Sequence, residues 1–261
     1  MNFQRFKSLV KGEKKRFNEF CRVNRLPLDY RTNHSGIGIL RSIFGDREYA
    51  DFFPFYRKAV VVDIGAHYGY FSLFARNNAK EGSKILALEP DPDNYRRLRK
   101  NLLDCAASNV VPMHCAIGGK PGKGTLYKGL NTNNSLIDDY PLAHREAGSA
   151  EVEIITLEDL VNENKLDRID FLKMDCEGAE YDIFEQTPPS VWDRIETLSM
   201  EFHDLKDEKA TGEFLMEVLV KSGFEIVKYQ YEKTSMDLNY GKLIGTRLLK
   251  RLKNGTRHQK A

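Results

Sequence analysis

The chain has 261 residues, of which 41% are hydrophobic and 30% charged, a balance typical of globular proteins with one large domain or two small ones. The formal net charge of +2 hides an uneven distribution, because residues 1–31 carry nine Lys/Arg against three acidic residues and residues 242–261 carry seven and none. An acidic middle with basic ends argues against an enzyme that binds nucleic acid across a broad basic face.

Residues 1–58 form an N-terminal lead-in that we expect to be helical in parts, with a break at Pro54. Its charged start lacks the apolar core of about 7–15 residues that a signal peptide needs. No apolar run in the chain approaches the roughly 20 residues of a membrane span. The four cysteines are scattered, with neither a C-x-x-C pair nor zinc spacing. We therefore predict a cytoplasmic protein with reduced thiols.

Strand and helix patterns alternate after the lead-in. The continuous apolar run at 59–64 is typical of a strand buried on both faces, and a helix through Phe71 and Phe74 follows it. The further expected strands are 84–89, 110–117, 150–156, 168–175, 194–203 and 224–232, with helices at 92–107, 178–186 and 212–223 and a Gly-rich section at 118–139. This order predicts an α/β fold with a Rossmann-like, doubly wound, mostly parallel sheet and helices on both faces.

We expect one large domain at 59–231, followed by a basic C-terminal tail at 232–261. The tail has apolar residues near helical spacing between its basic ones, an arrangement that would also suit peripheral contact with an anionic membrane. We favour a solvated terminus over that alternative.

The first strand runs directly into a short loop that contains two glycines, Gly65 and Gly69. In an open α/β sheet, ligands bind beyond the carboxyl ends of the strands, where this loop lies. Dinucleotides favour G-x-G-x-x-G, but His67 stands where the second glycine would be, so the loop is unsuited to a pyrophosphate. A nucleoside cofactor without phosphates, such as S-adenosylmethionine, fits the spacing better.

The second strand ends in Glu89, which is 24 residues after Gly65. An acid at about this distance commonly accepts hydrogen bonds from the two ribose hydroxyls of a nucleoside. Asp63, at the end of the first strand, is placed to orient the glycine loop and to face the cationic amino end of the cofactor. Together these residues favour cofactor binding over a purely structural turn.

The chain resembles the FkbM family of class I S-adenosylmethionine-dependent methyltransferases between about Val60 and Tyr231. The resemblance is carried, in chain order, by "VVDIGAHYGYFS", "ALEPDPDNYRRLRKNL", "HCAIGG", "NNSL", "ITLEDL", "IDFLKMDCEGAEYDIF" and "MEFH". It implies the class I fold with a seven-stranded sheet. It also implies O-methylation of hydroxyls on sugars, glycolipids, polyketides or related small molecules.

The resemblance also suggests roles for single residues in cofactor binding. The methionine-side loop would consist of Asp63, Gly65, Ala66 and Gly69. Glu89 would hold the ribose, Pro90 would shape the turn after it, and Asn94 either positions this loop or simply belongs to the first turn of its helix. Ala116 and Ile117 would flank the adenine, with ordinary core packing as the competing interpretation.

Candidate catalytic residues follow the strands at 168–175 and 194–203. Asp175 should point into the crevice, Glu177 follows at the start of a helix, and the block "MEFH" places Glu201 and His203 beside them. We expect Asp175 or His203 to take the acceptor proton and Glu177 to orient the acceptor or the base. As alternatives, Glu177 caps its helix and Lys173 pairs with an acid.

Other functions remain open from the sequence. Asp175, Glu177, Glu201 and His203 could instead hold Mg²⁺ or Mn²⁺, although we favour a site without metal. An NAD-dependent oxidoreductase is disfavoured by the glycine spacing, and a catalytically silent cofactor-binding protein by the intact Asp63, Glu89 and Asp175. The expected partner is a small-molecule or glycan acceptor, and no nucleic acid.

Overall fold

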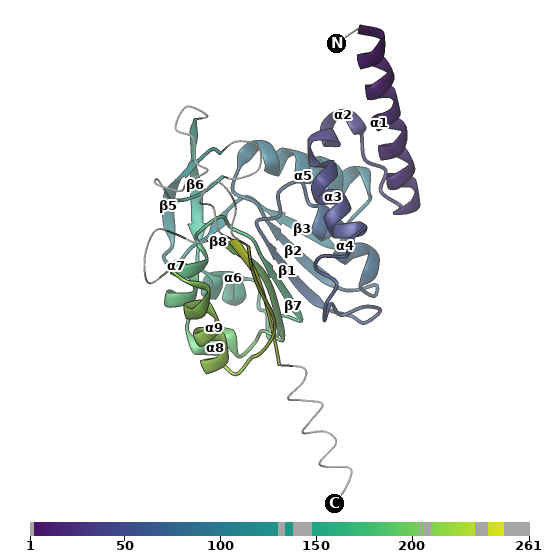
Figure 1. Cartoon of the computed structure of the whole chain (residues 1–261). Helices are drawn as coiled ribbons and strands as arrows, with labels where there is room; N and C mark the ends of the chain where they lie inside the picture. Colours follow the sequence, from purple (N-terminus) through teal and green to yellow (C-terminus); the bar gives the residue numbers. More distant parts are fainter. Residues whose placement is uncertain are drawn as a thin grey trace, which may run out of the picture.

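The computed structural model describes residues 3–129, 134–137, 148–203, 205, 210–232 and 240–247, with side chains from residue 12 onward. Its main sheet contains β1 (Val60–Ile64), β2 (Lys84–Leu88), β3 (Val110–Met113), β7 (Phe171–Met174), β8 (Thr197–His203), β9 (Glu225–Glu232) and β10 (Tyr240–Thr246). The strand order is β3-β2-β1-β7-β8-β10-β9 (Figure 1). All neighbours pair in parallel except β10, which is antiparallel to both β8 and β9. The predicted doubly wound, mostly parallel seven-stranded sheet is confirmed.

Helices cover both faces of this sheet (Figure 1). One layer contains α1 (Phe3–Val23), α2 (Tyr30–Asn33), a 3₁₀ turn (His34–Gly36), α3 (Ile37–Phe44), α4 (Tyr70–Asn78) and α5 (Pro92–Asp104). The other contains α6 (Leu157–Glu163), α7 (Glu180–Gln186), α8 (Pro189–Trp192) and α9 (Gly212–Lys221). Successive residues of β1 face opposite layers, so that Val61 and Val62 are both fully buried, each in a different core. This explains why β1 has consecutive apolar residues at Val60, Val61 and Val62 rather than apolar residues at alternate positions only.

The lead-in is part of the first core layer. Leu40 and Ile43 of α3 are buried in the same cluster as Phe71 of α4. Phe53 lies against the ring of Phe171 in β7, with their centroids 5.4 Å apart in an edge-to-face arrangement. Burial of apolar surface therefore fixes the lead-in against this face of the sheet.

The segment predicted as a single strand at 110–117 is divided between two sheets. β3 forms the edge of the main sheet, where Pro112 is tolerated because an edge strand need not donate every backbone hydrogen bond. β4 (Ala116–Ile117) instead pairs with β6 (Ser149–Ile155), which also pairs with β5 (Gly122–Tyr127). The predicted strand at 150–156 is therefore real but belongs to a second, three-stranded sheet.

The strand at 224–232 was expected to be the last along the chain, and this expectation was wrong. β10 lies within the segment predicted as a C-terminal tail, and it is inserted between β8 and β9. Residues 248–261, the rest of that segment, lie outside the described residues. None of the helices in the described ranges combines the length and apolar character needed to cross a bilayer.

Candidate functional site

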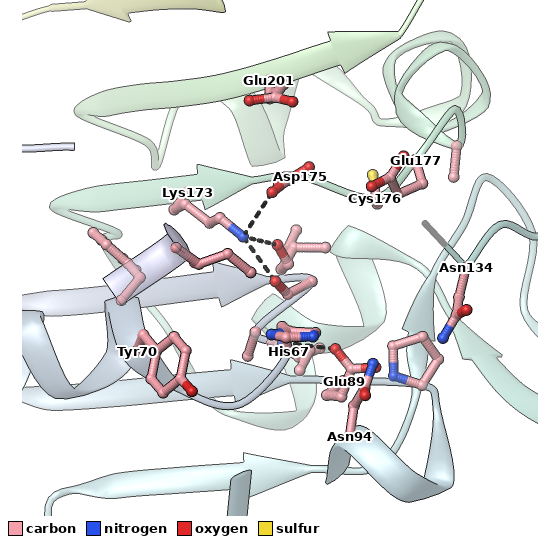
Figure 2. Close-up of a pocket in the computed structure, with 18 of the residues that line it drawn as sticks. His67, Tyr70, Glu89, Asn94, Asn134, Lys173, Asp175, Cys176, Glu177 and Glu201 are labelled. Atoms are coloured by element: carbon pink, nitrogen blue, oxygen red, sulfur yellow. Dashed lines mark hydrogen bonds and ion pairs between the residues drawn. The ribbon is translucent and has the colours of Figure 1, made fainter. Parts of the chain in front are cut away.

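A cavity of about 500 Å³ lies at the carboxyl ends of β1, β2 and β7 (Figure 2). Its walls come from the loop after β1, the loop after β2, the loop after β7, the small sheet, the lead-in and β10. The volume is within the usual range for small-molecule sites, and the position is where doubly wound sheets bind ligands.

The glycine loop after β1 is shaped by close contacts within the protein. Gly65 has φ +71, and a Cβ atom there would overlap the backbone carbonyl oxygen of Asp175. Gly69 has φ +80, and a Cβ atom there would overlap Leu98 of α5. Neither position accepts a side chain, because left-handed backbone and a crowded neighbour coincide. Gly65 lines the cavity, whereas Gly69 lies outside its lining and lets α4 approach α5.

Lys173, in β7, joins the glycine loop to the end of its own strand. Its Nζ donates hydrogen bonds to the carbonyl oxygens of Ile64 (3.2 Å) and Gly65 (2.7 Å). The same atom lies 3.5 Å from Oδ1 of Asp63. It also lies 3.6 Å from Oδ2 of Asp175 (Figure 2), and these contacts confirm the predicted pairing of Lys173 with an acid. Burial alone would lower the pKa of Lys173, but the charges of Asp175 and Asp63 raise it, so the ammonium stays charged.

Asp63 lies beneath the loop and outside the cavity lining. Its side chain is fully buried, and Oδ2 accepts a hydrogen bond of 2.6 Å from the Ser72 hydroxyl. Burial raises the pKa of Asp63, and the neighbouring Lys173 opposes that rise. In this structure Asp63 orients the loop from below, through Ser72 and Lys173.

Glu89 lines the cavity at the end of β2. The backbone N–H groups of His67 (2.7 Å) and Asp91 (2.9 Å) each donate to a different oxygen of its carboxylate. Asn94 Nδ2 lies 3.4 Å from Oε1, and both Asn94 and Pro90 also line the cavity. Burial raises the pKa of Glu89 to about 7, although the two backbone donors oppose the shift. Oε2 accepts only the bond from His67 among those given, so it keeps a further lone pair that a hydroxyl could use.

His67 lines the cavity beside Glu89, and the sequence prediction did not assign it to the site (Figure 2). Its ring stacks on Tyr68 with a centroid distance of 3.6 Å. Both ring nitrogens are buried without a hydrogen-bond partner among the described residues. Burial lowers the pKa of His67 to about 3, so the imidazole is neutral and offers one donor and one acceptor. Unmatched buried polar atoms are costly, and a polar ligand would relieve that cost.

The wall opposite β1 is apolar. Ala116 and Ile117 of β4 are buried and line the cavity together with Leu126 and Leu136 from the small sheet and its neighbourhood. A position in the cavity lining is compatible with the adenine interpretation, and burial is compatible with the core-packing interpretation.

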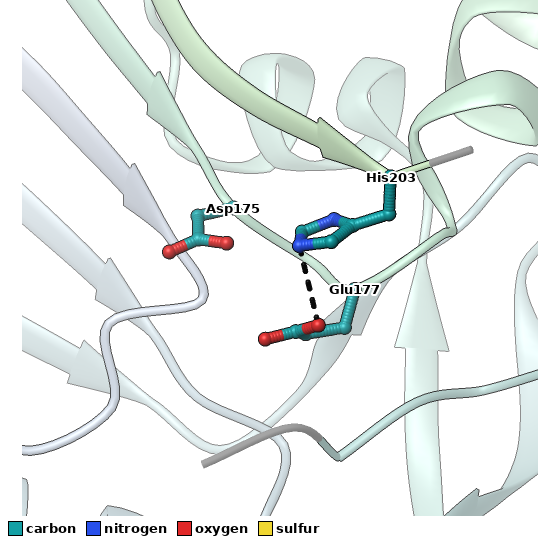
Figure 3. Close-up of side chains that lie close together, drawn as sticks. All are labelled: Asp175, Glu177 and His203. Carbon is teal, nitrogen blue, oxygen red and sulfur yellow. Dashed lines mark ion pairs between the residues drawn. The ribbon is translucent and has the colours of Figure 1, made fainter. Parts of the chain in front are cut away.

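Asp175 and Glu177 line the cavity after β7, while His203, at the end of β8, lies behind Glu177 (Figure 3). Glu177 has a left-handed backbone with φ +55, which is unusual for a residue with a side chain. Helix α7 begins later, at Glu180, and its N-cap Ala179 makes no side-chain cap. Glu177 therefore lies two residues before the N-cap position and does not occupy it. Its Oε2 lies 3.3 Å from Nε2 of His203 instead.

His203 is surrounded by carboxylates. Its Nδ1 lies 3.5 Å from Glu180, which is fully buried, and its Nε2 lies 3.6 Å from Glu201 as well as near Glu177. Burial alone would lower the pKa of His203, but these acids raise it well above its ordinary value. The ring is thus an imidazolium that pairs with Glu177, Glu180 and Glu201.

One group of ligand-type atoms could hold a metal ion. Asp175, Glu177 and His203 each offer an atom, and these atoms lie within 4.8 Å of one another (Figure 3). A divalent ion there would have to displace the proton that His203 shares with its carboxylates. The donor set, with one imidazole and two carboxylates, would suit Mg²⁺ or Mn²⁺.

The predicted site residues are thus largely gathered around one cavity. Those that line it are Gly65, Ala66, Glu89, Pro90, Asn94, Ala116, Ile117, Asp175 and Glu177. The remaining three, Asp63, Gly69 and His203, lie outside the cavity lining and contact residues that form it. Sequence reasoning missed His67, Glu180, Glu48 and Lys242, of which the last two come from segments that carry no recognisable motif.

Comparison with known proteins gives a family and several relatives. The family model described as "Methyltransferase FkbM domain" matches residues 63–228. "Methyltransferase 1" of Beauveria bassiana is 30% identical over 226 residues, which cover 80% of this chain and 89% of that protein. The "31-O-demethyl-FK506 methyltransferase FkbM" of Streptomyces tacrolimicus is 29% identical over 238 residues, covering 79% of this chain and 90% of that one.

Among solved structures, this chain is similar to the methyltransferase FkbM of Methylobacillus flagellatus KT. The TM-score is 0.47 at 13% sequence identity, and the match covers 72% of this chain and 44% of that one.

Proposed function

The chain belongs to the FkbM methyltransferase family, and from that membership we propose that it transfers the methyl group of S-adenosylmethionine to a hydroxyl of a sugar, glycolipid or other small molecule. The observation that carries this proposal is the single cavity that has Glu89 on one side of the glycine loop and Asp175 on the other. The relative from Streptomyces tacrolimicus is named for an O-demethyl substrate, and this supports oxygen as the methylated atom.

The residues of the cavity fit this cofactor. Glu89 can accept hydrogen bonds from the ribose hydroxyls, and the unmatched nitrogens of His67 can bind further polar groups. The apolar wall at Ala116 and Ile117 suits adenine. When bound, the cofactor would supply an electrophilic methyl group on a sulfonium.

The protein's own residues supply alignment and proton removal. Asp175 is the proposed general base, because its carboxylate lines the cavity and Lys173 stabilises its charge from 3.6 Å. The imidazolium of His203 holds Glu177 and Glu201, which then orient the acceptor. We propose that this chemistry needs no metal ion.

Calorimetry with S-adenosylhomocysteine, the demethylated cofactor, tests the proposal directly. We expect saturable binding of this compound and no competition by NADH, since His67 replaces the second glycine of a loop that receives a pyrophosphate. A labelled-methyl screen over sugar-containing extracts would then identify the acceptor. Binding of NADH in place of S-adenosylhomocysteine would refute the proposal.

The affinity for S-adenosylhomocysteine should depend on pH through Glu89. Its pKa is about 7, so its carboxylate loses an acceptor oxygen as the pH falls, and affinity should drop up to about tenfold from pH 8 to pH 6. The Glu89→Gln variant should bind more weakly at pH 8 and show no such slope. A wild-type affinity that is flat over this range would argue against Glu89 as the ribose ligand.

The stability of the unliganded protein should show the opposite trend. The folded pKa of Glu89 lies above the value of 4.5 expected for the unfolded chain, so the folded state binds more protons between about pH 4.5 and 7. The contribution of Glu89 to stability is therefore lost as the pH rises through about 7. Thermal unfolding of the wild-type protein and of Glu89→Gln measures this difference.

A further inference from the structure

One end of the cavity is built by segments outside the family match at 63–228. The lead-in contributes residues of α3 and of the turn after it, and β10 contributes Tyr240 and Lys242. The lead-in residues of the lining are Gly38, Ile39, Ser42, Ile43, Glu48 and Tyr49. The cofactor end of the cavity is thus lined by residues within the family match, and the outer end is built largely by segments outside it.

Lys242 is the central polar group of this outer end. It lies opposite Glu201 in the register of β10 and β8, and its Nζ is 3.8 Å from Oε2 of Glu201. Nζ also donates a hydrogen bond to Oε1 of Glu48, whose other oxygen accepts one from the Ser42 hydroxyl. Burial alone would lower the pKa of Lys242, but the bond to Glu48 raises it, so the ammonium stays charged. Two hydrogen bonds and one ion pair thus join these four side chains in a row.

This row lies next to the proposed base. Glu201 and Asp175 line the same cavity (Figure 2), and burial together with the charge of Asp175 raises the pKa of Glu201. The Nζ of Lys173 lies 5.9 Å from the ring centroid of Tyr49, and the same Nζ contacts Asp175. A molecule held by the row would therefore present its atoms to Asp175.

We propose that Ser42, Glu48, Glu201 and Lys242 form the acceptor subsite, and that it takes an uncharged molecule with neighbouring hydroxyls, such as a sugar ring or another polyol. This inference rests on the proposed function. The carboxylates of Glu48 and Glu201 have lone pairs left to accept hydrogen bonds from hydroxyls, and the ammonium of Lys242 can donate a hydrogen bond to a hydroxyl oxygen. The aromatic side chains of Tyr49 and Tyr240 offer surface for the carbon skeleton.

The charges argue for a neutral acceptor. Among the described lining residues, the ammonium groups are those of Lys173 and Lys242, and both already contact carboxylates. An anionic acceptor would meet Glu48, Glu201 and Asp175 with no unoccupied cation to balance it. A cationic acceptor would have to displace Lys242 from between Glu48 and Glu201.

Saturation-transfer NMR on the full chain loaded with S-adenosylhomocysteine tests the subsite. The probes are myo-inositol and D-glucose as neutral polyols, D-glucuronate as an anion, D-glucosamine as a cation and cyclohexanol as a lone hydroxyl. We expect the neutral polyols to bind with millimolar dissociation constants. The Glu48→Gln variant should weaken this binding roughly tenfold through loss of a charge-assisted hydrogen bond, and Ser42→Ala should weaken it less.

The matched control is Asp46→Asn, an exposed position in the same turn that does not line the cavity. It should leave polyol binding unchanged, and all three variants should bind S-adenosylhomocysteine as the wild type does, which also shows that they are folded. Failure of the wild type to bind S-adenosylhomocysteine would overturn the proposed function and this inference together. Three results would overturn this inference alone, provided that S-adenosylhomocysteine binds normally. They are no binding of the neutral polyols, tighter binding of a charged probe, and equal effects of Glu48→Gln and Asp46→Asn.

Discussion

Replacing Asp175 with asparagine is expected to slow methyl transfer about 10²–10⁴-fold while leaving the affinity for S-adenosylhomocysteine unchanged. The amide keeps the shape of the side chain but cannot accept the acceptor proton, so the loss corresponds to roughly 3–5 kcal/mol of activation free energy. Alignment in the cavity, which can contribute about 7–11 kcal/mol, is retained. Single-turnover transfer of a labelled methyl group, together with calorimetry, separates the two effects.

Two controls sharpen this experiment. Asp193→Asn changes an exposed carboxylate that precedes β8, at the opposite end of the sheet, and should have no effect on transfer. Excess EDTA should leave wild-type turnover unchanged, because His203 already shares its proton with carboxylates where a metal would bind. Unchanged turnover in Asp175→Asn would remove Asp175 as the base, and inactivation by EDTA would make it a metal ligand.

Replacing Gly65 with alanine is expected to abolish binding of S-adenosylhomocysteine and to lower the free energy of unfolding by at least about 3 kcal/mol. A Cβ atom there would overlap the backbone carbonyl oxygen of Asp175, and neither β1 nor β7 can move without breaking the sheet between them. The backbone would also remain left-handed, at φ +71. Chemical denaturation and calorimetry on the same sample measure both losses.

Gly82→Ala is the matched control for this substitution. Gly82 has a similar φ of +81, but its nearest neighbours would be atoms of the flexible Lys58 side chain, 3.5 Å or more away. It should therefore show only the strain of a left-handed alanine, about 1–2 kcal/mol, and bind S-adenosylhomocysteine normally. If the two variants behaved alike, the contact between Gly65 and Asp175 would have no special role.

The parts of the fold that could be predicted are those where one local pattern decides the structure. The apolar runs at β1 and β2 can only be strands buried on both faces, and the carboxyl ends of these strands then place Gly65 and Glu89 at the ligand crevice. The alternation of strands and helices along the chain likewise predicted the parallel sheet, because parallel neighbours need a helical crossover between them. These features depend on neighbours in sequence, which is why they were accessible without coordinates.

β10 was missed because its glycines look like loop residues. A Cβ atom on Gly241 would overlap the ring of Phe202, and one on Gly245 would lie 3.2 Å from Leu219. These glycines are therefore required by long-range packing inside a sheet, and the sequence alone shows only two flexible residues beside a basic stretch. Lys242 was missed with them, since its partners Glu48 and Glu201 are brought to it by the fold.

The electrostatics of the site could be predicted only in part. The sequence placed Asp175, Glu177 and His203 close together, but it left the base open between Asp175 and His203. The structure adds Glu180, a buried acid at the first position of α7, and the three carboxylates around His203 then favour Asp175 as the proposed base. Such a choice depends on burial and on distances of a few ångströms, which residue spacing does not encode.

The position of β10 has a consequence for how this protein is made. Ribosomes release a chain from its N-terminus, so β8 and β9 both emerge before the strand that will separate them, and each waits with an unpaired edge. Exposed edges of this kind invite association with other nascent chains. The late insertion of β10 also brings Lys242 to Glu48. Completion of the sheet and completion of the outer end of the cavity are therefore one folding event.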